Sequence, residues 1–145
     1  RTVAAPRSSV WAVLADYPNI SDWNEAMANS YALGDAVEGV GASRRCEFGS
    51  KGSISMRETV TEWAPEHKMV IAVDQTEKQP LKQGTMTITL SDGGETTPYT
   101  MSYDYEAKGG LLTFIYGPLL DRVYKKGFNG FIDDLEIAAQ ARAIA

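Results

Sequence analysis

The last long segment of the chain, residues 118–143, reads PLLDRVYKKGFNGFIDDLEIAAQARA. Its apolar residues recur at the spacing of one helix face, while charged and polar residues occupy the other side. That face consists of Leu120, Val123, Tyr124, Phe128, Phe131, Leu135, Ala138 and Ala139. Because proline is favoured at the first position of a helix, we expect one amphipathic helix from Pro118 to about Ala143. At the usual rise its length is on the order of 39 Å, enough to span a small sheet. We expect Gly117 and Pro118 to separate it from a shorter helical piece at residues 111–116.

The region before this helix has the alternating apolar and polar pattern of half-buried strands. We expect strands at residues 27–34, 42–49, 53–63, 68–76, 84–91 and 98–107. The turns between them are short, and a parallel crossover needs about a dozen residues, so the strands should form an antiparallel meander. Two short helices, at residues 8–16 and 19–23, are expected before it. The predicted fold class is α+β: a curved antiparallel sheet of six or seven strands that wraps a long C-terminal helix.

Composition and charge narrow the functional classes. Hydrophobic residues make up 43% of the 145 residues and charged residues 23%, which is typical of a globular protein and excludes a disordered chain. The net charge of −5 makes nucleic acid an unexpected partner. Cys46 is the only cysteine, which excludes a disulfide within the chain and a thiolate metal cluster. We expect residues 1–145 to form a single ligand-binding domain, either monomeric or homodimeric.

The expected location is the cytoplasm. No apolar stretch approaches the roughly 20 residues that a membrane-spanning helix needs. The chain opens with Arg1-Thr2-Val3, which has the pattern of a strand interior. We therefore expect a truncated first strand, and a signal peptide before Arg1 is compatible with the sequence.

A single helix is too slender to fill the concave face of such a sheet, so the sequence predicts an internal cavity. Gly127 lies in the apolar stripe, where a large side chain would be expected. It indicates open space near the middle of the helix, although close approach of the sheet or a bend in the helix would also explain a glycine. Because empty apolar volume lowers stability, we expect a cavity of this kind to serve a ligand.

The strand alternation predicts which residues face the cavity. Arg44 and Glu58 fall on the apolar faces of neighbouring strands, and they should pair because an unpaired buried charge is very costly. The pair is either a permanent structural one or a contact for the polar end of a ligand. A row of tyrosines at residues 99–105 is either a packing ladder or a source of hydroxyls for that ligand. The complete set of expected ligand-binding residues is Trp23, Met27, Tyr31, Arg44, Cys46, Phe48, Met56, Glu58, Val60, Met86, Ile88, Met101, Tyr103, Tyr105, Val123, Tyr124, Gly127, Phe128 and Phe131.

Several short motifs resemble one superfamily in their order and spacing. They are Ala5-Pro6, VWAVLADY at residues 10–17, Trp23-Asn24, GVGASRR at residues 39–45 and ETVTEWAP at residues 58–65. With the long terminal helix, they resemble the polyketide cyclase/dehydrase and lipid-transport family of START-like (Bet v 1-like, SRPBCC) proteins.

This resemblance implies a helix-grip fold, in which a seven-stranded antiparallel sheet grips the last helix with a hydrophobic ligand between them. In hormone receptors of this type, an Arg and a Glu on adjacent strands face the pocket, and Arg44 and Glu58 are similar to them. The gating loop of those receptors is reduced here to residues 49–52. A receptor-style latch is therefore not expected.

Three functional hypotheses remain. We favour a carrier or sensor that binds a small hydrophobic or aromatic ligand, such as a lipid or a polyketide-like compound. The alternative is a polyketide cyclase or aromatase without a cofactor, in which Arg44 and Tyr103 would polarise carbonyl groups and Glu58 would move a proton. The third is a protein-interaction module of the same fold. His67 is the only histidine, and the common nucleotide, hydrolase and zinc motifs are missing, so we expect neither a metal nor a cofactor.

Overall fold

Seven strands form one antiparallel sheet in the order β1-β7-β6-β5-β4-β3-β2. The structure is a computed structural model that describes residues 1–109 and 113–145, with only the backbone for residues 113–116. The strands are β1 (Thr2–Val3), β2 (Met27–Ala32), β3 (Ser43–Phe48), β4 (Ile54–Ala64), β5 (Lys68–Glu77), β6 (Leu81–Leu90) and β7 (Thr97–Ala107). Strands β2 to β7 pair in chain order, as short turns require. The predicted meander is confirmed, and β1 adds a seventh strand beside β7.

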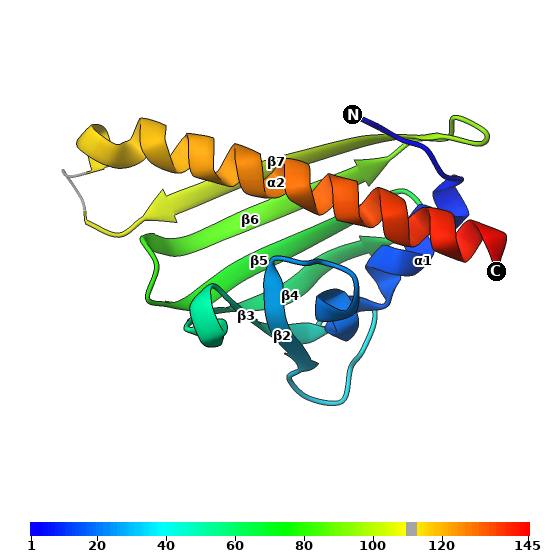
Figure 1. The fold of residues 1–145 in the computed structure, drawn as a ribbon. Coiled ribbons are helices and arrows are strands. Elements are labelled where there is room, and N and C mark those ends of the chain that lie inside the picture. Colours follow the sequence, from blue (N-terminus) through cyan, green and yellow to red (C-terminus); the bar gives the residue numbers. More distant parts are fainter. Residues whose placement is uncertain (110–112) are drawn as a thin grey trace.

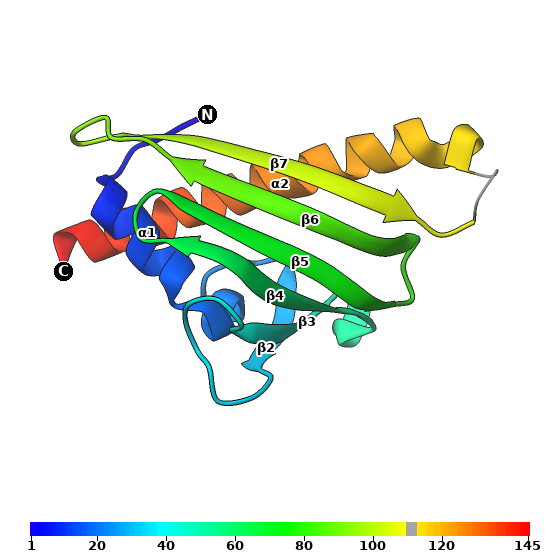
Figure 2. The same ribbon diagram turned by 180° about the vertical axis from the view of Figure 1, so that it is seen from behind.

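Short helices precede the meander and one long helix follows it (Figure 1). The first two are α1 (Arg7–Ala15) and the 3-10 helix η1 (Tyr17–Asp22), while η2 (Ser50–Gly52) is a single turn between β3 and β4. The long helix α2 (Thr113–Ile144) runs along one face of the sheet. Figure 2 shows the opposite face of β4 to β7, with α2 behind the strands. This arrangement confirms the predicted α+β class.

The predicted break before Pro118 is wrong, because α2 is continuous from Thr113 and contains Pro118. A proline removes one hydrogen bond of the helix, but its fixed φ is helical. Near the start of a long helix that single loss does not prevent a further turn on the N-terminal side. Residues 111 and 112 of the expected shorter helical piece lie outside the described residues.

Helix α2 is packed tightly only in its C-terminal half. Ile132, Leu135 and Ala139 are buried there, in one apolar cluster with side chains of α1 and of the sheet. Among the described side chains of residues 117–131, by contrast, none is buried. The C-terminal half of the helix is therefore held in the core, while its first half is only partly packed against the sheet.

Candidate functional site

A cavity of about 240 Å³ lies between the first half of α2 and the inner face of the sheet. Most of its wall is apolar or aromatic, with a few polar side chains. The lining residues are Leu14, Tyr17, Ile20, Trp23, Asn24, Ala26, Met27, Arg44, Phe48, Met56, Glu58, Met69, Ile71, Gln79, Leu81, Met86, Ile88, Tyr103, Val123, Tyr124, Gly127, Phe128 and Phe131. Pockets for drug-sized ligands start at about 300 Å³, so this cavity suits a smaller organic molecule.

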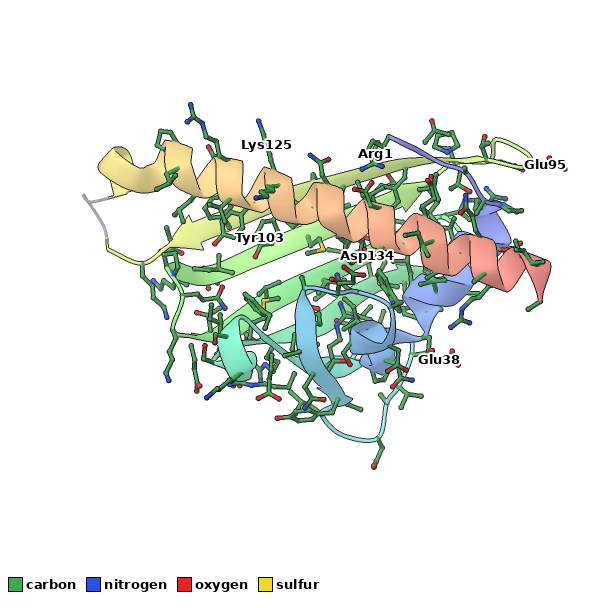
Figure 3. The ribbon with its side chains drawn as sticks, in the orientation of Figure 1. Arg1, Glu38, Glu95, Tyr103, Lys125 and Asp134 are labelled. Atoms are coloured by element: carbon green, nitrogen blue, oxygen red, sulfur yellow. The ribbon has the colours of Figure 1, made fainter. Side chains whose placement is uncertain are left out.

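The cavity reaches the surface between α2 and the connection from η1 to β2. Ala26, Val123 and Gly127 line it and are themselves exposed, Val123 by 56%. Farther along the helix lies Asp134 (labelled in Figure 3). Its Oδ2 accepts a hydrogen bond from the backbone N–H of Glu25 at 2.9 Å, which ties this connection to α2. The opening of the cavity therefore lies beside Val123 and Gly127.

Gly127 faces open space. A Cβ atom at this position would meet no atom within 4 Å outside the backbone of its own helix. The alternative that this glycine admits a close approach of the sheet is therefore wrong. Helix α2 continues through Gly127. Since Gly127 lines the cavity and is exposed, its missing side chain leaves the mouth of the cavity wider.

Arg44 and Glu58 form the expected ion pair in the wall of the cavity. The register of β3 and β4 places the two residues directly opposite each other. Nε of Arg44 donates to Oε2 of Glu58 at 2.6 Å, and Nη2 lies 2.5 Å from the same oxygen. The residues are only 5% and 2% exposed. A buried charge without a partner would lose its charge or destabilise the fold, so each of the two residues can be charged here only because the other is present.

Each nitrogen of the Arg44 guanidinium group has a partner. Its Nη1 donates to the backbone carbonyl of Tyr17 at 2.6 Å, and the group lies 4.0 Å above the centre of the Tyr17 ring. Burial alone would lower the pKa of Arg44, but the adjacent Glu58 carboxylate raises it above its ordinary value. Arg44 therefore stays cationic, and its charge is balanced inside the protein.

Cys46 also contacts this ion pair. Its thiol lies 3.6 Å from Oε2 of Glu58 and donates to it. Burial, together with the nearby Glu58 charge, raises the pKa of the Cys46 thiol well above its usual range. Since the nucleophilic form of a cysteine is the thiolate, Cys46 is not poised for covalent chemistry.

Several polar atoms of the wall lack a partner. Oε1 of Glu58 accepts no hydrogen bond from the described residues, in contrast to Oε2. The hydroxyl of Tyr17 and Nε1 of Trp23 are buried, and neither has a hydrogen-bond partner among the described residues. Protein atoms enclose the Tyr17 and Trp23 atoms almost completely, so of these three atoms only Oε1 of Glu58 is available to a ligand in the cavity.

Tyr103 joins the sheet to α2 across the cavity. Its ring (Tyr103 is labelled in Figure 3) packs edge-on against Tyr124 and Phe128, with centroid distances of 5.7 and 5.3 Å. Gly84 on β6 makes room for this ring, because a Cβ atom there would lie 3.0 Å from its Cε2, Cζ and hydroxyl oxygen. Burial raises the pKa of Tyr103 above its ordinary value, so the hydroxyl is neutral.

The row of tyrosines on β7 therefore divides by role. Tyr99 is 1% exposed and belongs to the packed core, while Tyr103 lines the cavity. Tyr105 stacks on Tyr103 and packs edge-on against Tyr124, and its hydroxyl donates to Asp121 at 2.5 Å. Tyr99 and Tyr105 thus pack against other protein side chains, and of the three tyrosines only Tyr103 lines the cavity.

The structure brings most of the expected ligand-binding residues together around the cavity. Those in its wall are Trp23, Met27, Arg44, Phe48, Met56, Glu58, Met86, Ile88, Tyr103, Val123, Tyr124, Gly127, Phe128 and Phe131. Tyr31, Cys46, Val60, Met101 and Tyr105 are not among the lining residues.

Each of these five has a physical reason to lie elsewhere. An irregularity in β2 between Met27 and Asn29 shifts the register, so Tyr31 points outward and is 46% exposed. Cys46 and Val60 are fully buried, in packed protein beside the cavity. Met101 and Tyr105 are half-buried against neighbouring side chains of the core.

Other lining residues were not expected from the sequence: Leu14, Tyr17, Ile20, Asn24, Ala26, Met69, Ile71, Gln79 and Leu81. For Met69 and Ile71 a signal existed, since both lie on the apolar face of the alternating pattern of β5. For Tyr17 and Ile20 none existed, because only the packing of η1 against the sheet brings them to the cavity.

Comparisons with known proteins agree with this architecture. A family model described as polyketide cyclase / dehydrase and lipid transport matches residues 1–139. A search of curated proteins found no significant match.

Solved structures that are similar to this chain include the Zhui aromatase/cyclase from Streptomyces sp. R1128. Its identity is 17% and its TM-score 0.81, over 98% of this chain and 91% of that one. A START superfamily protein from Mycobacterium smegmatis has 15% identity and a TM-score of 0.80, over 97% of this chain and 94% of that one. The protein TTHA0849 from Thermus thermophilus has 16% identity and a TM-score of 0.80 over the same shares. At these identities the likeness establishes the helix-grip fold.

Two further observations concern the described part of the chain. None of its helices combines the length and apolarity that crossing a membrane would require. No group of three or more His, Cys, Asp or Glu side chains within it is arranged to hold a metal ion.

Proposed function

The chain belongs to the polyketide cyclase/dehydrase and lipid transport family, and from this premise we propose that it binds a small, largely apolar organic ligand in the cavity beneath α2. The observation that carries the proposal is a largely apolar and aromatic cavity whose lining also includes a few polar side chains, among them Glu58 and Tyr103. Such a wall is typical of ligand sites, in which apolar contacts supply affinity and a few polar atoms set the orientation.

A carrier or sensor role is consistent with the contacts that Arg44 and Glu58 already make within the protein. Arg44 and Glu58 are committed to each other and to neighbouring groups, so Arg44 could polarise a ligand carbonyl only by giving up those contacts. His67, the only histidine, is exposed and does not line the cavity. Tight passive binding needs none of these groups to move.

One observation favours a second function, a polyketide cyclase or aromatase without a cofactor. Tyr103, together with Oε1 of Glu58, places a neutral hydroxyl and an unoccupied acceptor in one cavity wall. A hydroxyl could donate to a ketone oxygen while the carboxylate accepts a proton. Incubation with a linear poly-ketone, followed by mass spectrometry, separates the two functions, since ring closure with dehydration removes one water.

The binding proposal is tested with two matched variants on α2. Gly127 and Gly130 are both exposed helical glycines whose Cβ would meet no atom within 4 Å, but only Gly127 lines the cavity. Both substitutions, Gly127→Leu and Gly130→Leu, replace a poor helix former with a good one. Titration with the neutral dye 1-aminoanthracene, combined with native mass spectrometry for a co-purified ligand, measures binding.

We expect wild type and Gly130→Leu to bind the dye alike, and Gly127→Leu to bind at least about tenfold more weakly, since its side chain fills the mouth. The proposal fails if wild type binds no dye and carries no ligand. It also fails if Gly127→Leu, shown to be folded by circular dichroism, binds as well as Gly130→Leu.

A further inference from the structure

The charges in the cavity wall sum to zero. Among the described lining residues, Arg44 and Glu58 are the only ones that carry a full charge, and they lie within 2.6 Å of each other. Nε and Nη2 of Arg44 face Glu58, Nη1 donates to the carbonyl of Tyr17, and the face of the group lies on the Tyr17 ring. The positive charge of Arg44 is thus already balanced by Glu58 within the wall.

A carboxylate in this cavity would meet a second cost. It would lose its hydration and then lie near the carboxylate of Glu58, whose charge is already matched by Arg44. A buried charge without its own partner is strongly unfavourable, and like charges add to the penalty. The wall therefore discriminates against fatty acids and other carboxylates, although its apolar surface would accept their tails.

The unoccupied polar atoms specify what the ligand should carry instead. Oε1 of Glu58 is an acceptor without a donor, because an ionised carboxylate can only accept. Tyr103 also lines the cavity, and its hydroxyl can donate a hydrogen bond. A hydroxyl group answers both needs, because it donates one hydrogen bond and accepts others. An ether or a ketone could only accept.

From this pattern we infer that the cavity selects an uncharged cyclic compound with a hydroxyl group, which donates to Oε1 of Glu58. The inference deepens the proposed function and rests on it. The volume of about 240 Å³ and the aromatic walls of Trp23, Phe128 and Phe131 favour a flat body of about two fused rings.

The test uses three probes of one shape on the wild-type protein, freed of any co-purified ligand, at pH 7. They are 2-naphthol, which is neutral and donates a hydrogen bond, 2-methoxynaphthalene, which only accepts, and 2-naphthoate, which is an anion. Isothermal titration calorimetry gives the affinities. A titration of Gly127→Leu with each probe reports whether the cavity is the site.

We expect 2-naphthol to bind about tenfold or more tightly than 2-methoxynaphthalene, because a hydrogen bond to a charged acceptor is among the stronger ones. We expect 2-naphthoate to bind at least tenfold more weakly than 2-naphthol. Equal or tighter binding of 2-naphthoate overturns the inference, and so does equal binding of 2-methoxynaphthalene. If Gly127→Leu binds 2-naphthol as wild type does, the selectivity belongs to another surface and the inference is wrong. If none of the three binds, the proposed function fails as well, and the inference with it.

Discussion

Replacement of Glu58 by glutamine should destabilise the protein strongly. The change keeps the size of the side chain but leaves Arg44, which is 5% exposed, as a buried cation without a counter-ion. Oε2 of Glu58 is the oxygen that faces both Nε and Nη2 of Arg44, so the substitution removes the charge from both contacts at once. Breaking a buried pair from one side costs about 3–5 kcal/mol. Since a domain of this kind has a free energy of unfolding of about 5–15 kcal/mol, the loss is a large fraction of the total.

The loss of unfolding free energy in Glu58→Gln can be measured by urea unfolding, followed through tryptophan fluorescence. At this chain length the loss corresponds to a decrease in melting temperature of roughly 6–20 °C. The double variant Arg44→Met/Glu58→Gln should lose less than the sum of the two single variants, because neither remaining side chain is a stranded charge. A coupling free energy of about 1.5 kcal/mol or more is expected from this cycle.

The chain offers a matched control in a second pair on the sheet. Arg57 donates two hydrogen bonds to Asp74, at 2.8 and 2.6 Å, but the two side chains are 35% and 44% exposed. Water can replace either partner, so Asp74→Asn should have a much smaller effect than Glu58→Gln. If the two substitutions prove equally mild, or if the effects of Arg44→Met and Glu58→Gln simply add, the account of Arg44 and Glu58 as a mutually dependent buried pair is refuted.

Three further outcomes follow from single contacts. Gly84→Ala would place a Cβ 3.0 Å from the Tyr103 ring and push that ring into the cavity. The affinity for 1-aminoanthracene should therefore fall, while the circular dichroism spectrum stays unchanged. An unaltered affinity would show that Tyr103 does not line the binding site. The hydrogen bonds from Arg57 lower the pKa of Asp74 below 3.8, so the pair stabilises the fold above pH 3.8 and loses this effect as the pH falls through the lower pKa of the folded state. The stabilities of wild type and Asp74→Asn, measured by acid unfolding, should therefore converge at that pH. A difference that stays constant with pH would contradict this. Burial keeps the Cys46 thiol protonated, so iodoacetamide should label it only after the protein is unfolded in urea. Rapid labelling of the native protein would show that Cys46 is accessible and contradict this.

Local sequence patterns were sufficient to predict the helices and strands and many of the residues that line the cavity. The apolar stripe of residues 118–143 and the period-two alternation before it are properties of the chain alone, so helix, strands and meander could be predicted. The same alternation placed Arg44 and Glu58 on the inner face, and the cost of a lone buried charge made their pairing predictable. For Gly127, the absence of a side chain pointed to open space.

The sequence by itself thus determined the kinds of elements, their antiparallel order and the identity of the buried charged pair. Only the tertiary structure decided how far α2 stands from the sheet, because that distance depends on where the helix is anchored, at Leu135 and Ala139, and not on any local period. It also decided that Tyr31 turns outward, since one irregularity in β2 reverses the faces of all later residues in that strand. The side chain of Tyr17 reaches the cavity wall through the packing of η1 against β3, which no pattern within η1 encodes.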